Sequence, residues 1–211
     1  MGLITNGILN PGDRVSEAEI ARQLGISRSP VHEAFVRMIK DGLLAQSPRH
    51  GVFVAEMTDD EVREIVGFRE VVEGFAAREA CKRIRPEEIS RLRGILAEGA
   101  AAGRAGDWLT MEEKNAEFHD VLVACARHRL LSRVWAMLTP TKWKLTPGTR
   151  PRILDESGVQ DFLARHEAIV EALESGDPNR AEQVSVAHVR QVARNVVELR
   201  RRFDSQSPDG R

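Results

Sequence analysis

The most constraining feature of this sequence is a single glycine, Gly25, which lies between two short amphipathic segments. Ser16 and Glu19 have the spacing of a capping box that starts a helix, and Gly25 tolerates the left-handed backbone that ends one. Ile26 is expected to pack inward, and Ser27 can cap a second helix. The second segment places apolar residues on one helical face, at Val31, Ala34, Phe35, Met38 and Ile39. The pattern predicts a helix-turn-helix.

A short hairpin pattern follows the two helices. Gly42 is expected to stop the second helix, residues 43–45 and 52–54 are predicted as strands, and Pro48 and Gly51 mark the turn between them. The helix pair alone is also compatible with a small helical hairpin that has a solvated polar face. The strands behind it favour a winged helix-turn-helix instead.

A winged helix-turn-helix predicts where DNA would be contacted. Recognition helices present their N-terminal end to the major groove, where Arg28 can reach guanine and Ser29 a base or a phosphate. Arg49 and His50 are placed at the tip of the hairpin, within reach of a phosphate or the minor groove. The formal net charge of the chain is only −1. Affinity for DNA must therefore come from the positions of the cations and from dimerisation, because total charge does not supply it.

The rest of the chain is predicted to be helical. Thr58 and Glu61 have the spacing of a second capping box, and no strand-like alternation follows. Pro140 is expected to kink or break one helix, and residues 146–158 are expected to form a loop. The predicted helices cover residues 62–83, 86–103, 107–127, 130–138, 159–175 and 178–203 and form an antiparallel bundle. The predicted domains are 1–56 for the winged module and 58–204 for the helical domain, with a disordered tail at 205–211.

Three of the six histidines have a suggestive arrangement. Asn115 and His119 are i, i+4 on one predicted helix and share a face. His166 lies ten residues before Gly176 and His188 ten residues after Pro178, so each is about 15 Å from the same turn between antiparallel helices. Three neutral imidazoles with an amide or carboxylate oxygen suit Zn²⁺ or Ni²⁺. The alternative is a set of unrelated hydrogen-bonded core or surface histidines.

Two groups of motifs resemble a known family. The runs NPGDRVSE (10–17), GISRSPVHEA (25–34) and DGLL (41–44) resemble the N-terminal domain of GntR-family bacterial transcription regulators. The runs REVVE (69–73), NAEFH (115–119), HEAIVEAL (166–173) and AH (187–188) are similar to the effector-binding FCD domain of the FadR-type branch. The resemblance implies a dimeric regulator that binds an operator and a small carboxylate effector beside a metal ion.

The resemblance also implies individual site residues. The implied metal ligands are Asn115, His119, His166 and His188, and the residues that match DNA-contacting positions are Arg28, Ser29, His32, His50 and Gly51. Pro30 and Arg49, which lie among them, complete the candidate DNA-binding residues. In the family, arginines commonly face the effector pocket, but this chain has residues 139–144 (TPTKWK) in that region. Arg69, Lys142 and Lys144 are therefore the candidate anion partners, although each is also compatible with a solvated surface charge.

The sequence departs from the family pattern at three further places. His32 stands where the family usually has arginine, which alters a charge-assisted contact to DNA. Asn115 replaces the usual aspartate, and a neutral oxygen holds a divalent cation less strongly. The family has a full helix before the Pro11-Gly12 turn, whereas only residues 1–9 precede it here. We expect that helix to be truncated, or the true start to lie upstream of Met1.

These observations favour one function over two alternatives. Two widely separated cysteines and the absence of a long apolar span predict a cytoplasmic protein rather than a secreted or membrane protein. The expected function is a metabolite-responsive transcription regulator, most often a repressor, that binds an inverted repeat as a dimer and is not an enzyme. The first alternative is a metal sensor in which the ion is the effector. The second is a metalloenzyme fused to a DNA-binding arm, but it has no obvious general base, because Glu117 and Glu167 are immediate neighbours of the histidines and point about 100° away from them on a helix.

Overall fold

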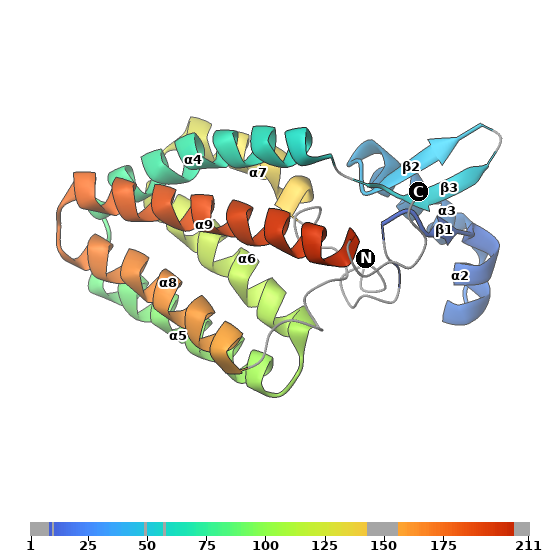
Figure 1. Ribbon diagram of the computed structural model, residues 1–211. Coiled ribbons are helices and arrows are strands. Elements are labelled where there is room, and N and C mark those ends of the chain that lie inside the picture. Colours follow the sequence, from blue (N-terminus) through green and yellow to red (C-terminus); the bar gives the residue numbers. More distant parts are fainter. Residues whose placement is uncertain (1–8, 10, 49, 57, 143–155, 205–211) are drawn as a thin grey trace. The chain divides into compact units, whose positions relative to one another are not determined.

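The computed structural model describes residues 9, 11–48, 50–56, 58–142 and 156–204, and it describes the side chains of these residues except at 139–142 and 195–204 (Figure 1). The predictions for Arg49, Lys144 and the 205–211 tail lie outside the described residues, as do most of the predicted 146–158 loop and the side chain of Lys142. The chain divides into two units, with a boundary between Thr58 and Asp59.

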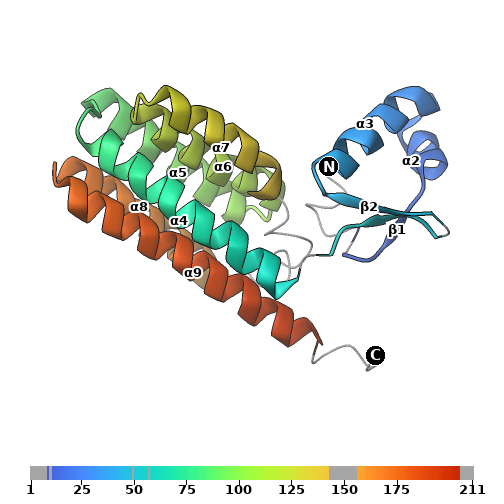
Figure 2. The same ribbon diagram turned by 90° about the horizontal axis from the view of Figure 1, so that it is seen from above.

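The N-terminal unit is a winged helix-turn-helix. It contains β1 (Arg14–Val15), α2 (Glu17–Leu24), α3 (Arg28–Lys40), β2 (Leu44–Ser47) and β3 (Gly51–Val54). The three strands form an antiparallel sheet in the order β1-β3-β2, and α3 packs against both α2 and β2 (Figure 2). The core of the unit consists of Val15, Ala21, Val31, Phe35, Leu44 and Val54.

The structure confirms some of the local predictions for this unit and contradicts others. Gly25 ends α2 with a left-handed φ of 66°, as expected. Ser16 and Ser27 occupy the N-cap positions of α2 and α3, but neither side chain makes a capping hydrogen bond, so the capping box at Ser16 is wrong. Ile26 is 46% exposed rather than inward-facing, because Val31 and Phe35 fill the core on the far side of the turn.

Six further helices follow in the described residues, in agreement with the predicted mainly α architecture. They are α4 (Asp59–Cys81), α5 (Pro86–Arg104), α6 (Trp108–Cys125), α7 (Arg129–Lys142), α8 (Glu156–Glu174) and α9 (Pro178–Asp204). Helix α4 packs along α9 and also contacts α6 and α8, while α5 packs against α6 and α8 (Figures 1 and 2). Pro140 does not end α7, which continues to Lys142, so the predicted end at Leu138 is too early. A proline removes one hydrogen bond from a helix that can otherwise run on.

Gly74 allows α4 and α9 to pack closely against each other. A Cβ atom at Gly74 would lie only 2.8 Å from Cγ2 of Val186, so a side chain on α4 at this position would push α9 away. The neighbouring residue Glu73 is completely buried as a result of this close packing and of its position on the inner face of α4. None of the described helices combines the length and the apolar composition that a membrane span requires.

Candidate functional site

Every buried polar or charged residue in the described part of the chain belongs to one cluster inside the helical unit. The six residues are Arg69, Glu73, His119, His166, Ser185 and His188. They come from α4, α6, α8 and α9, whose surrounding positions are apolar. Burying polar groups is unfavourable unless they are paired, and a domain of this size can fill its core with apolar side chains. The concentration of six in one place therefore makes this cluster the candidate binding site.

The three predicted histidines meet at the centre of this cluster. The ring centroids of His166 and His188 are 4.4 Å apart, and those of His119 are 5.4 Å and 5.2 Å from them. One ring nitrogen from each histidine lies within 4.8 Å of the others. Two imidazole nitrogens on one tetrahedral ion, at bonds of about 2.1 Å, are about 3.4 Å apart. The donor atoms would therefore have to approach one another by no more than about 1.4 Å to bind a single ion.

Hydrogen bonding and burial prepare these rings to act as ligands. His166 Nδ1 donates to the backbone carbonyl of Phe162 at 2.7 Å, which leaves the Nε2 lone pair of His166 free. Nε2 of His166 and Nδ1 of His188 are buried and have no hydrogen-bond partner. Burial and the neighbouring histidines hold the pKa of His166 well below its usual range and lower the pKa of His188 to about 3. Both rings are therefore neutral, the form that binds a divalent cation.

Helix α4 adds an ion pair that the sequence analysis did not identify as a unit. Arg69 Nε donates to Glu73 Oε1 at 2.6 Å, and Glu73 Oε2 lies 2.9 Å from His119 Nδ1. Burial opposes ionisation of Glu73, but the Arg69 guanidinium and the His119 ring outweigh it and hold the pKa of this carboxyl well below its usual range. Ser185 donates to the backbone carbonyl of Glu73 at 3.2 Å. The signal was present, because residues 69 and 73 continue the stripe of buried positions along α4.

Two other predicted site residues of this unit are Asn115 and Arg69. Asn115 is half-buried on α6, one helical turn before His119. Its role as an oxygen ligand stays a prediction. Arg69 is buried and paired with Glu73, rather than solvated at the surface. A guanidinium has five N–H donors, so this pairing leaves Arg69 able to contact an anion as well.

The predicted DNA-contacting residues are exposed where the fold requires them. Arg28, Ser29 and Pro30 form the first turn of α3, and His32 follows on the same helix, with all four side chains exposed. His32 Nδ1 lies 2.9 Å from Glu17 Oε1 on α2, so this ring is held by a carboxylate. Sequence reasoning did not anticipate this contact.

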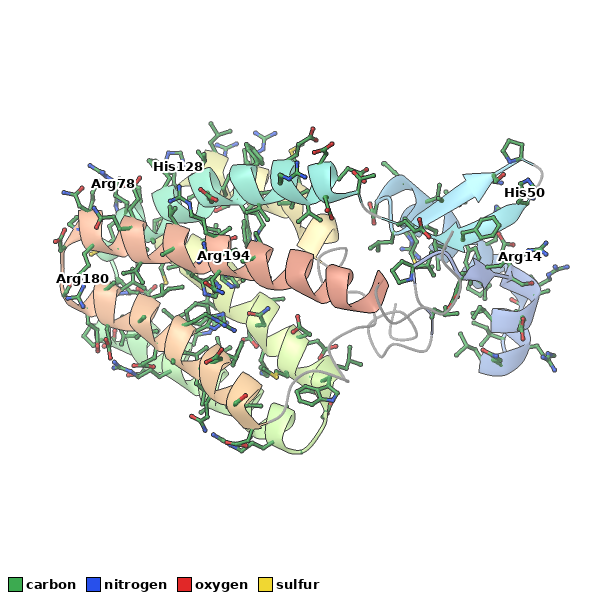
Figure 3. The ribbon with its side chains drawn as sticks, viewed as in Figure 1. Arg14, His50, Arg78, His128, Arg180 and Arg194 are labelled. Atoms are coloured by element: carbon green, nitrogen blue, oxygen red, sulfur yellow. The ribbon has the colours of Figure 1, made fainter. Side chains whose placement is uncertain are left out.

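The hairpin carries the other predicted contacts. His50 is exposed on the hairpin between β2 and β3 (Figure 3). Gly51 has a left-handed φ of 97°, and a Cβ there would lie 3.3 Å from Nε of Arg14. Arg14, on β1, is a further exposed cation beside the hairpin that the sequence analysis did not single out. The sequence gives little indication of its position, because a strand of only two residues has no recognisable pattern.

Comparison with known proteins decides which family has this combination. A family model described as the FCD domain matches residues 64–191, and one described as bacterial regulatory proteins, gntR family, matches residues 2–54. This chain belongs to the GntR family and carries an FCD domain. It is accordingly a DNA-binding transcription regulator and not an enzyme.

Curated relatives of this GntR-family regulator agree with the assignment. It is 31% identical over 186 residues to the probable D-xylose utilization operon transcriptional repressor of Paenarthrobacter nicotinovorans, covering 88% of this chain and 80% of that protein. It is 25% identical over 198 residues to the HTH-type transcriptional repressor RspR of Escherichia coli strain K12, covering 93% and 85%.

Solved structures share the fold of this regulator over nearly its full length. Escherichia coli McbR/YncC has a TM-score of 0.77 at 20% sequence identity, with 95% of this chain and 93% of that chain covered. A GntR transcriptional regulator from Rhodococcus sp. RHA1 has a TM-score of 0.72 at 24% identity, with 93% of each chain covered. At these identities the likeness concerns the fold alone.

Proposed function

We propose that this GntR-family regulator is a cytoplasmic homodimeric repressor that binds an inverted-repeat operator. Its switch is a small carboxylate effector that binds beside a Zn²⁺ or Ni²⁺ ion in the helical unit. The observation that carries the proposal is the group of three buried histidines with unpartnered ring nitrogens, of which His166 and His188 are held neutral. The repressors among its relatives favour repression over activation.

The chemistry of the donor set favours an anionic effector. The three imidazoles and the amide of Asn115 are neutral ligands, and the charges of Arg69 and Glu73 cancel each other. A divalent ion in this site would therefore keep most of its positive charge within a buried region. An uncompensated charge is very unfavourable in an apolar interior. A carboxylate supplies the missing charge and an oxygen ligand together, and Arg69, Lys142 and Lys144 are the candidate side chains for its remaining oxygen.

An exposed apolar surface supports the homodimer. On α4, Phe68, Val71 and Phe75 are 48%, 67% and 38% exposed and recur at i, i+3 and i+7. On α7, Leu130 and Met137 are 63% and 78% exposed. The ring of Phe75 packs edge-on against that of His128, the residue just before α7, with 5.4 Å between the ring centroids. This contact connects α4 with the start of α7. Exposed apolar side chains on two segments that touch in this way favour a protein–protein contact, and a twofold dimer would present two recognition helices to an inverted repeat.

The decisive experiment measures operator binding as a function of ion and effector. Fragments from the promoter region of the protein's own gene are titrated by fluorescence anisotropy at fixed salt, with Zn²⁺, Ni²⁺ or chelator, and with a panel of small carboxylates. We expect specific binding of an inverted repeat by a dimer, and a change in affinity with one carboxylate only when the ion is present.

Two variants separate the parts of the proposal. His166→Ala/His188→Ala should lose ion binding and the effector response while it keeps operator binding, and Arg28→Ala should lose operator binding alone. A response to the ion without any carboxylate would identify a metal sensor instead. Failure to protect any inverted repeat would refute the operator proposal, and unchanged ion content in the double variant would refute the ion site.

A further inference from the structure

The carboxylate of Glu73 is the only buried acid in the described part of the chain, and its two oxygens face different partners. Oε1 accepts from Arg69 Nε at 2.6 Å, whereas Oε2 lies 2.9 Å from Nδ1 of His119. The second contact has the length of a hydrogen bond but not its alignment, because both Oε2 and Nδ1 lack a hydrogen-bond partner. A small rotation of the His119 ring would direct its N–H at this oxygen.

We propose that Glu73 is a positioning residue for the ion, which holds His119 with Nδ1–H toward its carboxylate and Nε2 toward the metal. The inference rests on the ion site of the proposed function. Histidine ligands commonly donate their second nitrogen to a carboxylate, which fixes the tautomer and increases the basicity of the ligating nitrogen. His166 already has such a partner in the Phe162 carbonyl, and Glu73 gives His119 the equivalent one.

The surroundings of Glu73 fit a positioning residue better than a direct ligand. Its donor atoms are not among those that gather within 4.8 Å, which belong to the three histidines. Arg69 fixes one oxygen of the carboxylate, and Ser185 donates to the backbone carbonyl of the same residue, so both the side chain and the backbone of Glu73 are held. A carboxylate held in this way can orient a ring without moving toward the ion.

The proposed role of Glu73 also bears on Asn115, which stands where the family usually has an aspartate. A site with an aspartate at that position contains its own negative charge, whereas an amide supplies none. Arg69 balances the net charge of Glu73, but the carboxylate still offers an acceptor to Nδ1–H of His119 without occupying a coordination position. The ion then keeps an open position for an effector, while the basicity of one ligand is increased.

The test measures zinc affinity and the protonation of His119 in the full-length protein. Competition with a chromophoric chelator gives the affinity of Glu73→Gln, which should fall by about 10- to 100-fold, as is typical when the partner of a ligating histidine is lost. Long-range ¹H–¹⁵N spectra of ¹⁵N-histidine protein show which ring nitrogen binds Zn²⁺. In the wild type it should be Nε2 of His119, with a proton on Nδ1.

Two further variants keep the test decisive. Glu73→Gln leaves Arg69 buried without its partner and can unfold the chain, so Arg69→Met/Glu73→Gln, which removes both charges, should show the same loss of zinc affinity in a folded protein. Glu117→Gln is the matched control, because Glu117 is on α6 near His119 but pairs with Lys114 and Arg91 at the surface. It should bind zinc like the wild type.

The outcomes separate this inference from the ion site itself. Wild-type zinc affinity in the folded Arg69→Met/Glu73→Gln variant, or zinc on Nδ1 of His119, would overturn the positioning role while leaving the ion site intact. A wild-type protein that binds neither Zn²⁺ nor Ni²⁺ would overturn the ion site and this inference with it.

Discussion

Acidification should destabilise the ion-free helical unit through two histidines. The pKa of His188 is lowered from 6.5 to about 3, and that of His166 lies well below 6.5, chiefly because burial disfavours the charged ring. Above pH 6.5 both rings are neutral in the folded and the unfolded chain. Below it, the unfolded chain binds a proton at each histidine that the folded chain does not bind. The free energy of unfolding must therefore fall as the pH decreases from 6.5 toward 3.

The magnitude follows from proton linkage. Each group contributes about 1.4 kcal/mol per pH unit once the pH is well below its unfolded pKa. Between pH 7 and pH 5 the loss is about 2 kcal/mol for each histidine and about 4 kcal/mol for both. Glu73 adds almost nothing in this interval. Its depressed pKa stabilises the fold above its ordinary pKa of 4.5, and that contribution is lost only at lower pH.

Urea unfolding in the presence of a chelator at pH 7, 6 and 5 measures this loss. The fluorescence of Trp135, which is 4% exposed on α7, reports on the helical unit. His188→Gln removes one titrating ring and should reduce the loss by about half, whereas His50→Gln on the exposed hairpin should not change it. An unfolding free energy that is equal at pH 7 and pH 5, or an unchanged loss in His188→Gln, would refute the reasoning.

Three other predictions concern the rest of the molecule. Phe35→Ala should destabilise the winged unit by about 3–5 kcal/mol, because Phe35 is only 2% exposed, and chemical denaturation followed by circular dichroism measures the change. Val71→Glu/Met137→Glu should convert a dimer to a monomer in analytical ultracentrifugation, since both positions lie on the exposed apolar surface; a dimer in this variant would place the interface elsewhere. His32→Arg should increase operator affinity and steepen its salt dependence by about one phosphate contact, and an unchanged slope would show that this residue does not reach DNA.

Local signals explain most of what the sequence predicted correctly. Helix periodicity is set by near neighbours, so the segments from α4 to α9 were found with ends displaced by a few residues. His166 and His188 meet because a tight turn joins two antiparallel helices, which makes distance from the turn a reliable guide. His119 joins them from α6, and its helical face was evident from the i, i+4 spacing.

The features that were missed depend on contacts between distant segments. Strand β1 has two residues and exists because Arg14 and Val15 pair with β3, a register that no local pattern contains. Glu73 was overlooked because a charged residue on a helix is ordinarily solvated. It is buried here because its carboxylate lies against Arg69 and His119, and His119 is on a different helix. The capping hydrogen bond expected at Ser16 depends on a rotamer that sequence spacing does not determine.

The buried cluster is better explained by ligand binding than by stability. Replacing buried ion pairs with apolar residues is often neutral or stabilising, so the set that includes Arg69, Glu73 and His188 does not need to be there for the fold to form. An ion at 100 times its dissociation constant stabilises the folded state by about 2.7 kcal/mol, roughly two-thirds of the loss expected at pH 5. The partners of His119 lie on α4, which begins at Asp59, while β3 of the winged unit ends at Val54. In the proposed function, ion binding would act on α4, the first helix after the DNA-binding unit. An effector would then change operator affinity to the extent that it favours one packing of that helix over another.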